Sequence, residues 1–203
     1  MVRFLLHRSA AATAAAAAVF LAVPVAGFAQ SSQSSGSSMS LIPYTTYGYV
    51  GLNLGRANYK TPCSGLFTCN DSNIGGEIYT GGMFTRAFGL ELGYVNTGDA
   101  DRNGGKTKAQ GVNISLVGNL PVTDTFNVFA KGGTTYGWTS VSAAPGTVPT
   151  GDTNGFGLSY GAGLGFDVSR SVQLVAQWDR NRFKFVSGRD DVDLYTVGLK
   201  YKF

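Results

Sequence analysis

The stretch Asp193-Leu-Tyr-Thr-Val-Gly-Leu-Lys-Tyr-Lys-Phe203 decides which fold the sequence predicts. Successive side chains of a β-strand point to opposite faces, so from Tyr195 onward this stretch has one apolar face. That face carries Tyr195, Val197, Leu199, Tyr201 and Phe203, and the other carries Thr196, Gly198, Lys200 and Lys202. Such a strand fits either the last strand of a soluble sandwich or the lipid-facing wall of a membrane barrel. The rest of the sequence favours the barrel.

The composition favours a chain of short strands and turns. The chain has 203 residues, of which 29 are glycine, 12% are aromatic and 14% are charged. Charged residues make up about a quarter of an ordinary soluble domain, so this chain is poor in charge. It is still not hydrophobic enough overall to be a bundle of membrane helices, and its length suits one domain.

Residues 1–29 have the features of a secretion signal. A positively charged start precedes an uncharged, Ala-rich stretch at 10–28, and Gly27 and Ala29 are the small residues that a signal peptidase requires. We expect cleavage after Ala29. The alternative is an uncleaved membrane helix, which Pro24 would break. Cleavage leaves 14 basic and 12 acidic residues, a net charge of +2, so the basic balance gives no reason to expect a nucleic-acid partner.

Residues 30–43 form a Ser-rich polar tract that cannot bury enough apolar surface to order itself, and we expect a flexible tail before a barrel at 44–203. Cys63 and Cys69 are the only cysteines, and they flank a small loop. In an exported protein such a pair is expected to form a disulfide, with two free thiols as the alternative.

Eight candidate strands alternate apolar and polar residues between turn signals. They cover residues 47–59, 73–84, 88–96, 109–120, 126–138, 155–167, 171–182 and 193–203. The joins alternate between short ones, around 85–87, 121–125 and 168–170, and longer ones at 60–72, 97–108, 139–154 and 183–192. Short periplasmic turns and long outer loops are typical of outer-membrane barrels. The pattern predicts an all-β, eight-stranded antiparallel transmembrane β-barrel with up-and-down meander topology.

The alternation also predicts the interior of this barrel. Among the polar side chains that it turns inward are four charged ones, Glu77, Glu91, Lys131 and Lys200. Two acids then face two lysines, so the interior can neutralise itself, with Lys200 expected to pair with Glu77 or Glu91. An eight-stranded barrel is just wide enough to be filled by side chains, and unpaired buried charge is costly. We therefore favour a hydrogen-bonded plug with at most a small conductance over an open polar channel.

Five segments resemble the transmembrane domain of outer membrane protein A and its relatives over residues 44–203. They are residues 81–94, 120–124, 128–133, 161–167 and 174–180. The resemblance implies an OmpA-like, porin-related barrel at the cell surface, in the outer membrane of a Gram-negative bacterium. Interior acid–arginine pairs are typical of this family, but Val175 and Gln177 stand where the seventh strand would carry Arg and Glu. Because nothing follows Phe203 here, we expect no peptidoglycan-binding domain.

The last residues also resemble the signal that the outer-membrane assembly machinery reads, with Leu199, Tyr201 and Phe203 at two-residue steps. Lipids, including lipopolysaccharide, and the assembly machinery are therefore expected partners. The loops could contact host surface molecules or phage, and we expect a monomer.

Enzymatic chemistry is not expected. The only histidine, His7, leaves with the signal, so the mature chain lacks the usual general base of lipid-modifying barrels. No metal-ligating or phosphate-binding motif occurs in the sequence, so we expect no catalytic residue, metal or cofactor. The function predicted is a structural or surface-interaction role through the extracellular loops, around a largely plugged interior. The alternative is a small-solute porin with a narrow channel.

Overall fold

The computed structural model describes residues 45–60, 72–102, 105–144 and 149–203. The predicted signal peptide (1–29), the Ser-rich tail (30–43) and the Cys63–Cys69 pair lie outside the described residues and remain predictions. Among the described residues, no helix is both long and apolar enough to cross a membrane.

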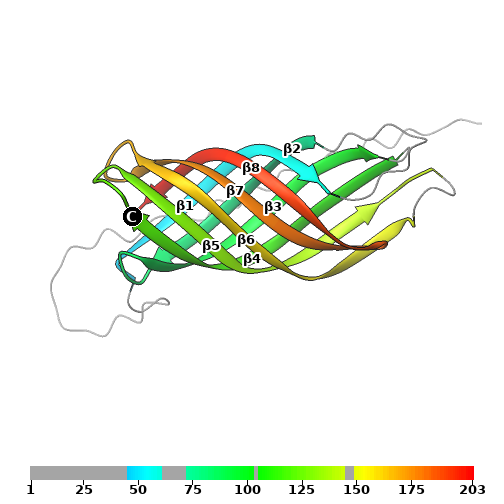
Figure 1. Ribbon diagram of the computed structural model, residues 1–203, viewed down its shortest axis with the longest axis horizontal. Helices are drawn as coiled ribbons and strands as arrows, with labels where there is room; N and C mark the ends of the chain where they lie inside the picture. The colour runs from blue at the N-terminus through cyan, green and yellow to red at the C-terminus, as the bar shows by residue number, and fades with distance from the viewer. Residues whose placement is uncertain (1–44, 61–71, 103–104, 145–148) are drawn as a thin grey trace, which may run out of the picture. The chain divides into compact units, whose positions relative to one another are not determined.

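Eight antiparallel strands form one closed barrel in which each strand pairs with its neighbours in the sequence and β8 pairs with β1 (Figure 1). They are β1 (Tyr47–Tyr59), β2 (Ser72–Met83), β3 (Phe88–Arg102), β4 (Gly105–Pro121), β5 (Phe126–Val141), β6 (Gly151–Asp167), β7 (Val172–Phe185) and β8 (Gly188–Lys202). The predicted fold class, an all-β eight-stranded antiparallel barrel with meander topology, is confirmed.

The wall of the barrel is apolar outside and polar inside. In β1, Leu52 and Leu54 are 55% and 58% exposed, whereas Asn53 between them is fully buried. A soluble protein would bury the leucines, so this arrangement requires lipid around the barrel. The same alternation runs through the other strands, because a period of two fixes the face on which each residue lies.

One end of the barrel, which we call the turn end, carries three four-residue turns of one design, at 84–87, 122–125 and 168–171. In each, the hydroxyl of the second residue (Thr85, Thr123 or Ser169) accepts backbone N–H bonds from the two residues that lie two and three positions further on. Ser and Thr hydroxyls stabilise turns in this way. The turn end also holds Phe203 (Figure 1).

At the opposite end, the loop end, the strands run further than predicted. The long joins expected at 97–108 and 183–192 are wrong, whereas the one expected at 139–154 remains as a shorter join at 142–150. β3 and β4 are separated only by residues 103–104, and β7 and β8 only by 186–187. Turn-forming residues after Asn96 indicated a loop, but Gly98, with φ of 69°, lies in a β-bulge between Asn96 and Asp99, beyond which pairing continues. A glycine at positive φ can serve a bulge as well as a turn.

The polarity of the wall inverts in these extensions. In β7, Phe183 and Phe185 point inward and are 1% and 3% exposed, while Arg182 and Lys184 point outward and are exposed. Nearer the turn end of the same strand the arrangement is the opposite: the apolar Leu174 points outward, at 48% exposure, and the polar Gln177 points inward. Charged residues on the outer surface mark the part of the barrel that leaves the hydrocarbon region.

Candidate functional site

A buried charged cluster crosses the middle of the barrel interior. The Nζ atom of Lys131 in β5 lies 3.1 Å from Oε2 of Glu77 in β2, 3.2 Å from Oε1 of Glu91 in β3 and 3.2 Å from Oδ1 of Asp179 in β7. All four side chains are less than 10% exposed. One ammonium therefore ties together four strands from different sides of the barrel.

Neutral polar groups complete the hydrogen bonding of the three carboxylates. Gln177 Nε2 donates to Oε2 of Glu77 and to Oδ2 of Asp179, both at 2.7 Å. Asn113 Nδ2 donates to Oε1 of Glu77 at 3.0 Å, and the Tyr49 hydroxyl donates to Oε2 of Glu91 at 3.1 Å. A buried network of this kind is stable only when its members are satisfied, so the cluster has the properties of a fixed plug.

Lys200 lies apart from this cluster. Its Nζ atom lies 4.5 Å from the ring centroid of Tyr49, 5.0 Å from that of Phe129 and 5.6 Å from that of Tyr79. It forms no ion pair with any carboxylate in the described ranges of the chain. The expected pairing of Lys200 with Glu77 or Glu91 is therefore wrong, because Lys131 binds both carboxylates. Ring faces attract cations, and here they surround the ammonium in place of a counter-charge.

Asp179 is the member of the cluster that was not among the predicted interior charges. It lies two residues after Gln177 in β7 and is 5% exposed. Strand parity alone would have turned it inward together with Gln177.

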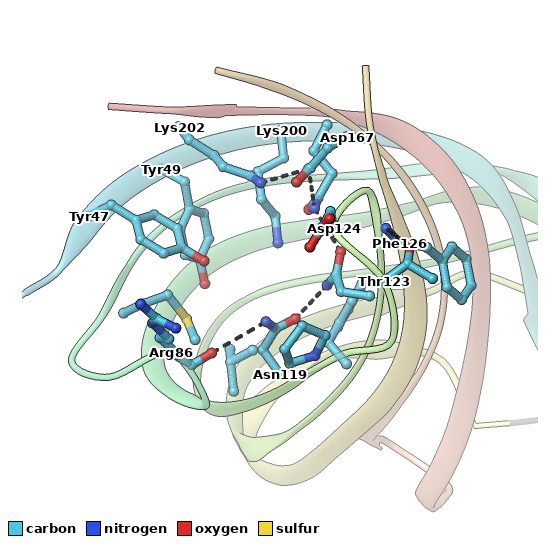
Figure 2. A pocket seen from close by; sticks show the side chains of 16 residues that line it. Tyr47, Tyr49, Arg86, Asn119, Thr123, Asp124, Phe126, Asp167, Lys200 and Lys202 are labelled. Atoms are coloured by element: carbon cyan, nitrogen blue, oxygen red, sulfur yellow. Dashed lines mark hydrogen bonds and ion pairs between the residues drawn. The ribbon is translucent and has the colours of Figure 1, made fainter. Parts of the chain in front are cut away.

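On the turn-end side of Lys200, a cavity of about 320 Å³ extends to the turn end of the barrel (Figure 2). We call it the vestibule. Its charged and amide-bearing lining residues are Arg86, Asn119, Asp124, Asn127, Asp167, Gln173, Lys200 and Lys202. On one wall, Lys202 Nζ lies 2.6 Å from Oδ1 of Asp167, and Gln173 Nε2 donates to the same oxygen at 2.7 Å. These contacts fix one side of the vestibule.

On the loop-end side of the charged cluster, apolar side chains fill the interior of the barrel. We call this group the apolar plug. It consists of Ala57, Tyr59, Val95, Ala100, Ala109, Phe183, Phe185, Val192 and Leu194, all at most 3% exposed. The residues come from five strands and pack against one another across the interior. The interior thus has three layers, which are the vestibule, the charged cluster and the apolar plug.

The outer surface near the loop end carries ion pairs. Arg180 donates from Nε and Nη2 to the two carboxylate oxygens of Asp193 at 2.6 and 2.9 Å, and Lys60 Nζ lies 2.9 Å from the same carboxylate. Arg182 pairs with Asp191 at 2.8 Å. Much of the positive charge of this rim is therefore already paired.

Leu199, Tyr201 and Phe203, the expected assembly signal, lie on the outer face of the closing strand and are 53%, 52% and 70% exposed. The backbone of Phe203 exchanges two hydrogen bonds with Gly48, at 2.9 and 3.0 Å. A Cβ atom at position 48 would lie 2.7 Å from the Phe203 ring, so the glycine leaves room for the ring. No group of three or more potential ligand residues suited to a metal ion occurs in the described part of the chain.

A closed eight-stranded barrel with an apolar outer wall and a polar interior defines a small outer-membrane β-barrel protein. The family model of the outer membrane protein beta-barrel domain matches residues 13–203, and the chain belongs to this family of non-enzymatic barrels of the Gram-negative outer membrane. The recognised likeness to outer membrane protein A is confirmed by the comparison with curated proteins.

Two relatives illustrate that likeness. Outer membrane protein A of Salmonella typhi is 28% identical over 201 residues, which cover 92% of this chain and 55% of that protein. The Shigella flexneri protein is 25% identical over 200 residues, with the same coverage. The chain thus spans about half the length of the curated relatives it matches.

Solved structures share the fold at low identity. Neisserial surface protein A has a TM-score of 0.59 at 15% identity and covers 77% of this chain and 97% of its own. OprG of Pseudomonas aeruginosa has a TM-score of 0.52 at 14% identity, with 79% and 97% covered. Ail of Yersinia pestis, solved with the heparin analogue sucrose octasulfate, has a TM-score of 0.50 at 17% identity, with 77% and 99% covered.

Proposed function

We propose that this protein is a structural component of the outer membrane, with a closed interior and a loop end that is available to surface partners. The observation that carries the proposal is the position of Lys131, whose ammonium binds three carboxylates across the interior at 3.1 to 3.2 Å. Export by the signal at 1–29 would deliver the chain, and its turn end would face the periplasm, as short turns do in this class.

Two layers support a closed interior. Opening the charged cluster would separate Lys131 from carboxylates in a region of low dielectric constant, and breaking such buried pairs costs about 3–5 kcal/mol. Beyond the cluster, a solute would still meet the apolar plug, in which Phe183 is 1% exposed. Close-packed apolar side chains leave few voids larger than a water molecule.

Liposome swelling and planar-bilayer recording with the refolded full chain test the closed interior. We expect swelling with small sugars close to that of protein-free liposomes, and no large, steady conductance. The double variant Lys131→Ala/Phe183→Ala removes the centre of both layers and should raise both signals. Leu158→Ala is the matched control, because Leu158 is 59% exposed on the outer wall.

Large, steady channels in the unmodified protein would contradict the proposal and favour the small-solute porin. A double variant that is folded, as shown by faster migration of the unboiled protein on gels, and yet as closed as the parent would show that other residues close the barrel.

The surface role is proposed for the hairpins of the loop end. β3–β4 and β7–β8 extend past the point where charged residues replace apolar ones on the outer wall. Several of their basic residues are paired, for example Lys108 with Asp99 at 3.0 Å and Arg182 with Asp191. A surface of mixed, paired charge fits a host surface protein or a phage protein better than a polyanion such as the one bound by Ail.

Exchange of the β7–β8 tip, residues 184–189, for a Gly-Ser hairpin tests this role. We expect adhesion to host cells, or phage adsorption, to fall while the barrel still folds. A matched exchange of the turn at 168–171 should leave binding unchanged, because that turn lies at the other end. If neither exchange alters adhesion or adsorption, the hairpins have no such role.

A further inference from the structure

The Lys200 side chain presents a buried cation without a protein anion. It is 8% exposed, and its ammonium lies near the ring faces of three aromatic residues. Within the described residues it forms no ion pair with a carboxylate. Ring faces stabilise the positive charge, but they leave the directional N–H donors of an ammonium without oxygen acceptors. The Lys200 ammonium therefore lacks a negatively charged hydrogen-bond acceptor.

The vestibule gives such an acceptor room. Lys200 is one of its lining residues, and Figure 2 shows the Lys200 ammonium pointing into the open space that the labelled residues surround. The volume of about 320 Å³ lies at the lower end of the range for small-molecule pockets, which runs from about 300 to 1,000 Å³. The cavity thus has room for a small molecule.

The charge of the vestibule has the matching sign. Arg86, Lys200 and Lys202 line it together with two acids, Asp124 and Asp167. Lys202 is already neutralised by Asp167 at 2.6 Å. Asp124 lies on the turn at 122–125 and forms no ion pair with Lys200, so a positive charge remains at the inner end of the cavity.

We propose that the vestibule binds a small oxyanion, a carboxylate or a phosphate, whose oxygens accept hydrogen bonds from the Lys200 ammonium. Tyr49 and Phe129 hold the ammonium from the side by their ring faces, and the open end admits the anion from the turn end of the barrel. Tyr49 joins this site to the charged cluster, since its hydroxyl donates to Glu91, but the anion site does not depend on the proposed structural role.

Nuclear magnetic resonance on the full chain folded in detergent micelles tests the site. The ring signals of Tyr49 and Phe129 are followed while sodium phosphate or, in a second arm, sodium acetate replaces sodium chloride at constant ionic strength. We expect saturable shifts, and the arm with the tighter dissociation constant identifies phosphate or carboxylate as the preferred group.

Two lysine variants separate a specific site from general attraction. Lys200→Met should weaken binding at least about ten-fold, the size of effect expected for a charged hydrogen bond. The double variant Lys202→Met/Asp167→Asn removes the second lysine together with its counter-charge, so the net charge of the vestibule is unchanged and the dissociation constant should change less than about three-fold. Equal weakening by both variants would reduce the effect to general electrostatics and overturn the proposal.

A third variant keeps the test decisive if Lys200→Met does not fold. Asp124→Asn removes a competing carboxylate from a turn, outside the barrel wall, and should tighten anion binding. Unchanged or weaker binding in this variant, or the absence of saturable shifts for both anions in the unmodified protein, would show that the vestibule is not an oxyanion site.

Discussion

The Nζ atom of Lys131 lies 3.2 Å from Oδ1 of Asp179, although β5 and β7 are not neighbours in the barrel. Both residues pair with Gly161 of the intervening strand β6, so the contact passes over this glycine along the inner face of the wall. Together with Glu77 and Glu91 on the opposite side, it makes Lys131 the centre of the charged cluster. The stability of the cluster should therefore depend unequally on its members.

Replacement of the central cation should be the most damaging change in the cluster. Lys131→Met leaves three buried carboxylates without their cation, and we expect it to lower the free energy of unfolding by about 3–5 kcal/mol. Asp179→Asn should cost less, because Lys131 retains Glu77 and Glu91. Urea unfolding in lipid vesicles, followed by tryptophan fluorescence, measures both.

Lys184→Met is the matched control, since Lys184 is exposed on the outer surface, and it should change stability by less than about 0.5 kcal/mol. If Lys131→Met behaved like Lys184→Met, the cluster would not hold the barrel together.

The sequence was sufficient for much of this fold because the period of two is a local property. It placed the lipid-facing residues and located the strand ends at the turn end to within one residue, as for Met83 and Phe88. At the loop end the same reasoning failed, since Gly98 serves a bulge and the polarity of the wall inverts above it. A turn signal and a bulge signal look alike in one sequence.

The interior was predictable in composition but not in pairing. Parity turns Lys131 and Lys200 inward equally, and it would turn Asp179 inward too. Which lysine meets the acids depends on the height of each residue in the tilted barrel, and hence on the register between all eight strands. Alternation within one strand excludes a slip by one residue, but it does not distinguish registers that differ by two residues.

The bulge at Gly98 should tolerate no side chain. Its φ is 69°, and a Cβ atom there would lie 2.3 Å from the carbonyl oxygen of Ile74. We expect Gly98→Ala to lower the free energy of unfolding by about 1–3 kcal/mol, the cost of a strained backbone site. Gly132→Ala is the matched control, because nothing lies within 4 Å of the added carbon, and it should be nearly neutral. Equal urea midpoints for the two variants would contradict this interpretation of the bulge.

Loss of Phe203 should impair closure and assembly of the barrel. Its backbone hydrogen bonds to Gly48 join the end of the chain to the first strand. We expect deletion of Phe203 to reduce the fraction of heat-modifiable protein in outer-membrane fractions several-fold. Phe166→Ala is the control, because Phe166 is also an exposed aromatic residue near the turn end, at 51%, but lies in β6. Comparable losses in both would indicate that the effect belongs to outward aromatic residues in general.

Lys200→Met should behave in the opposite way to Lys131→Met when no anion is added. Desolvation of an ammonium costs several kcal/mol, and contacts with ring faces return only about 0.5–2 kcal/mol. Because Lys200 has no carboxylate to leave behind, methionine removes the cost of burying the charge and retains the packing against Tyr49 and Phe129. We expect unchanged or increased stability in urea unfolding in chloride buffer. A loss as large as that from Lys131→Met would mean that Lys200 has an anionic partner within the protein, and that the vestibule has no unpaired cation to offer.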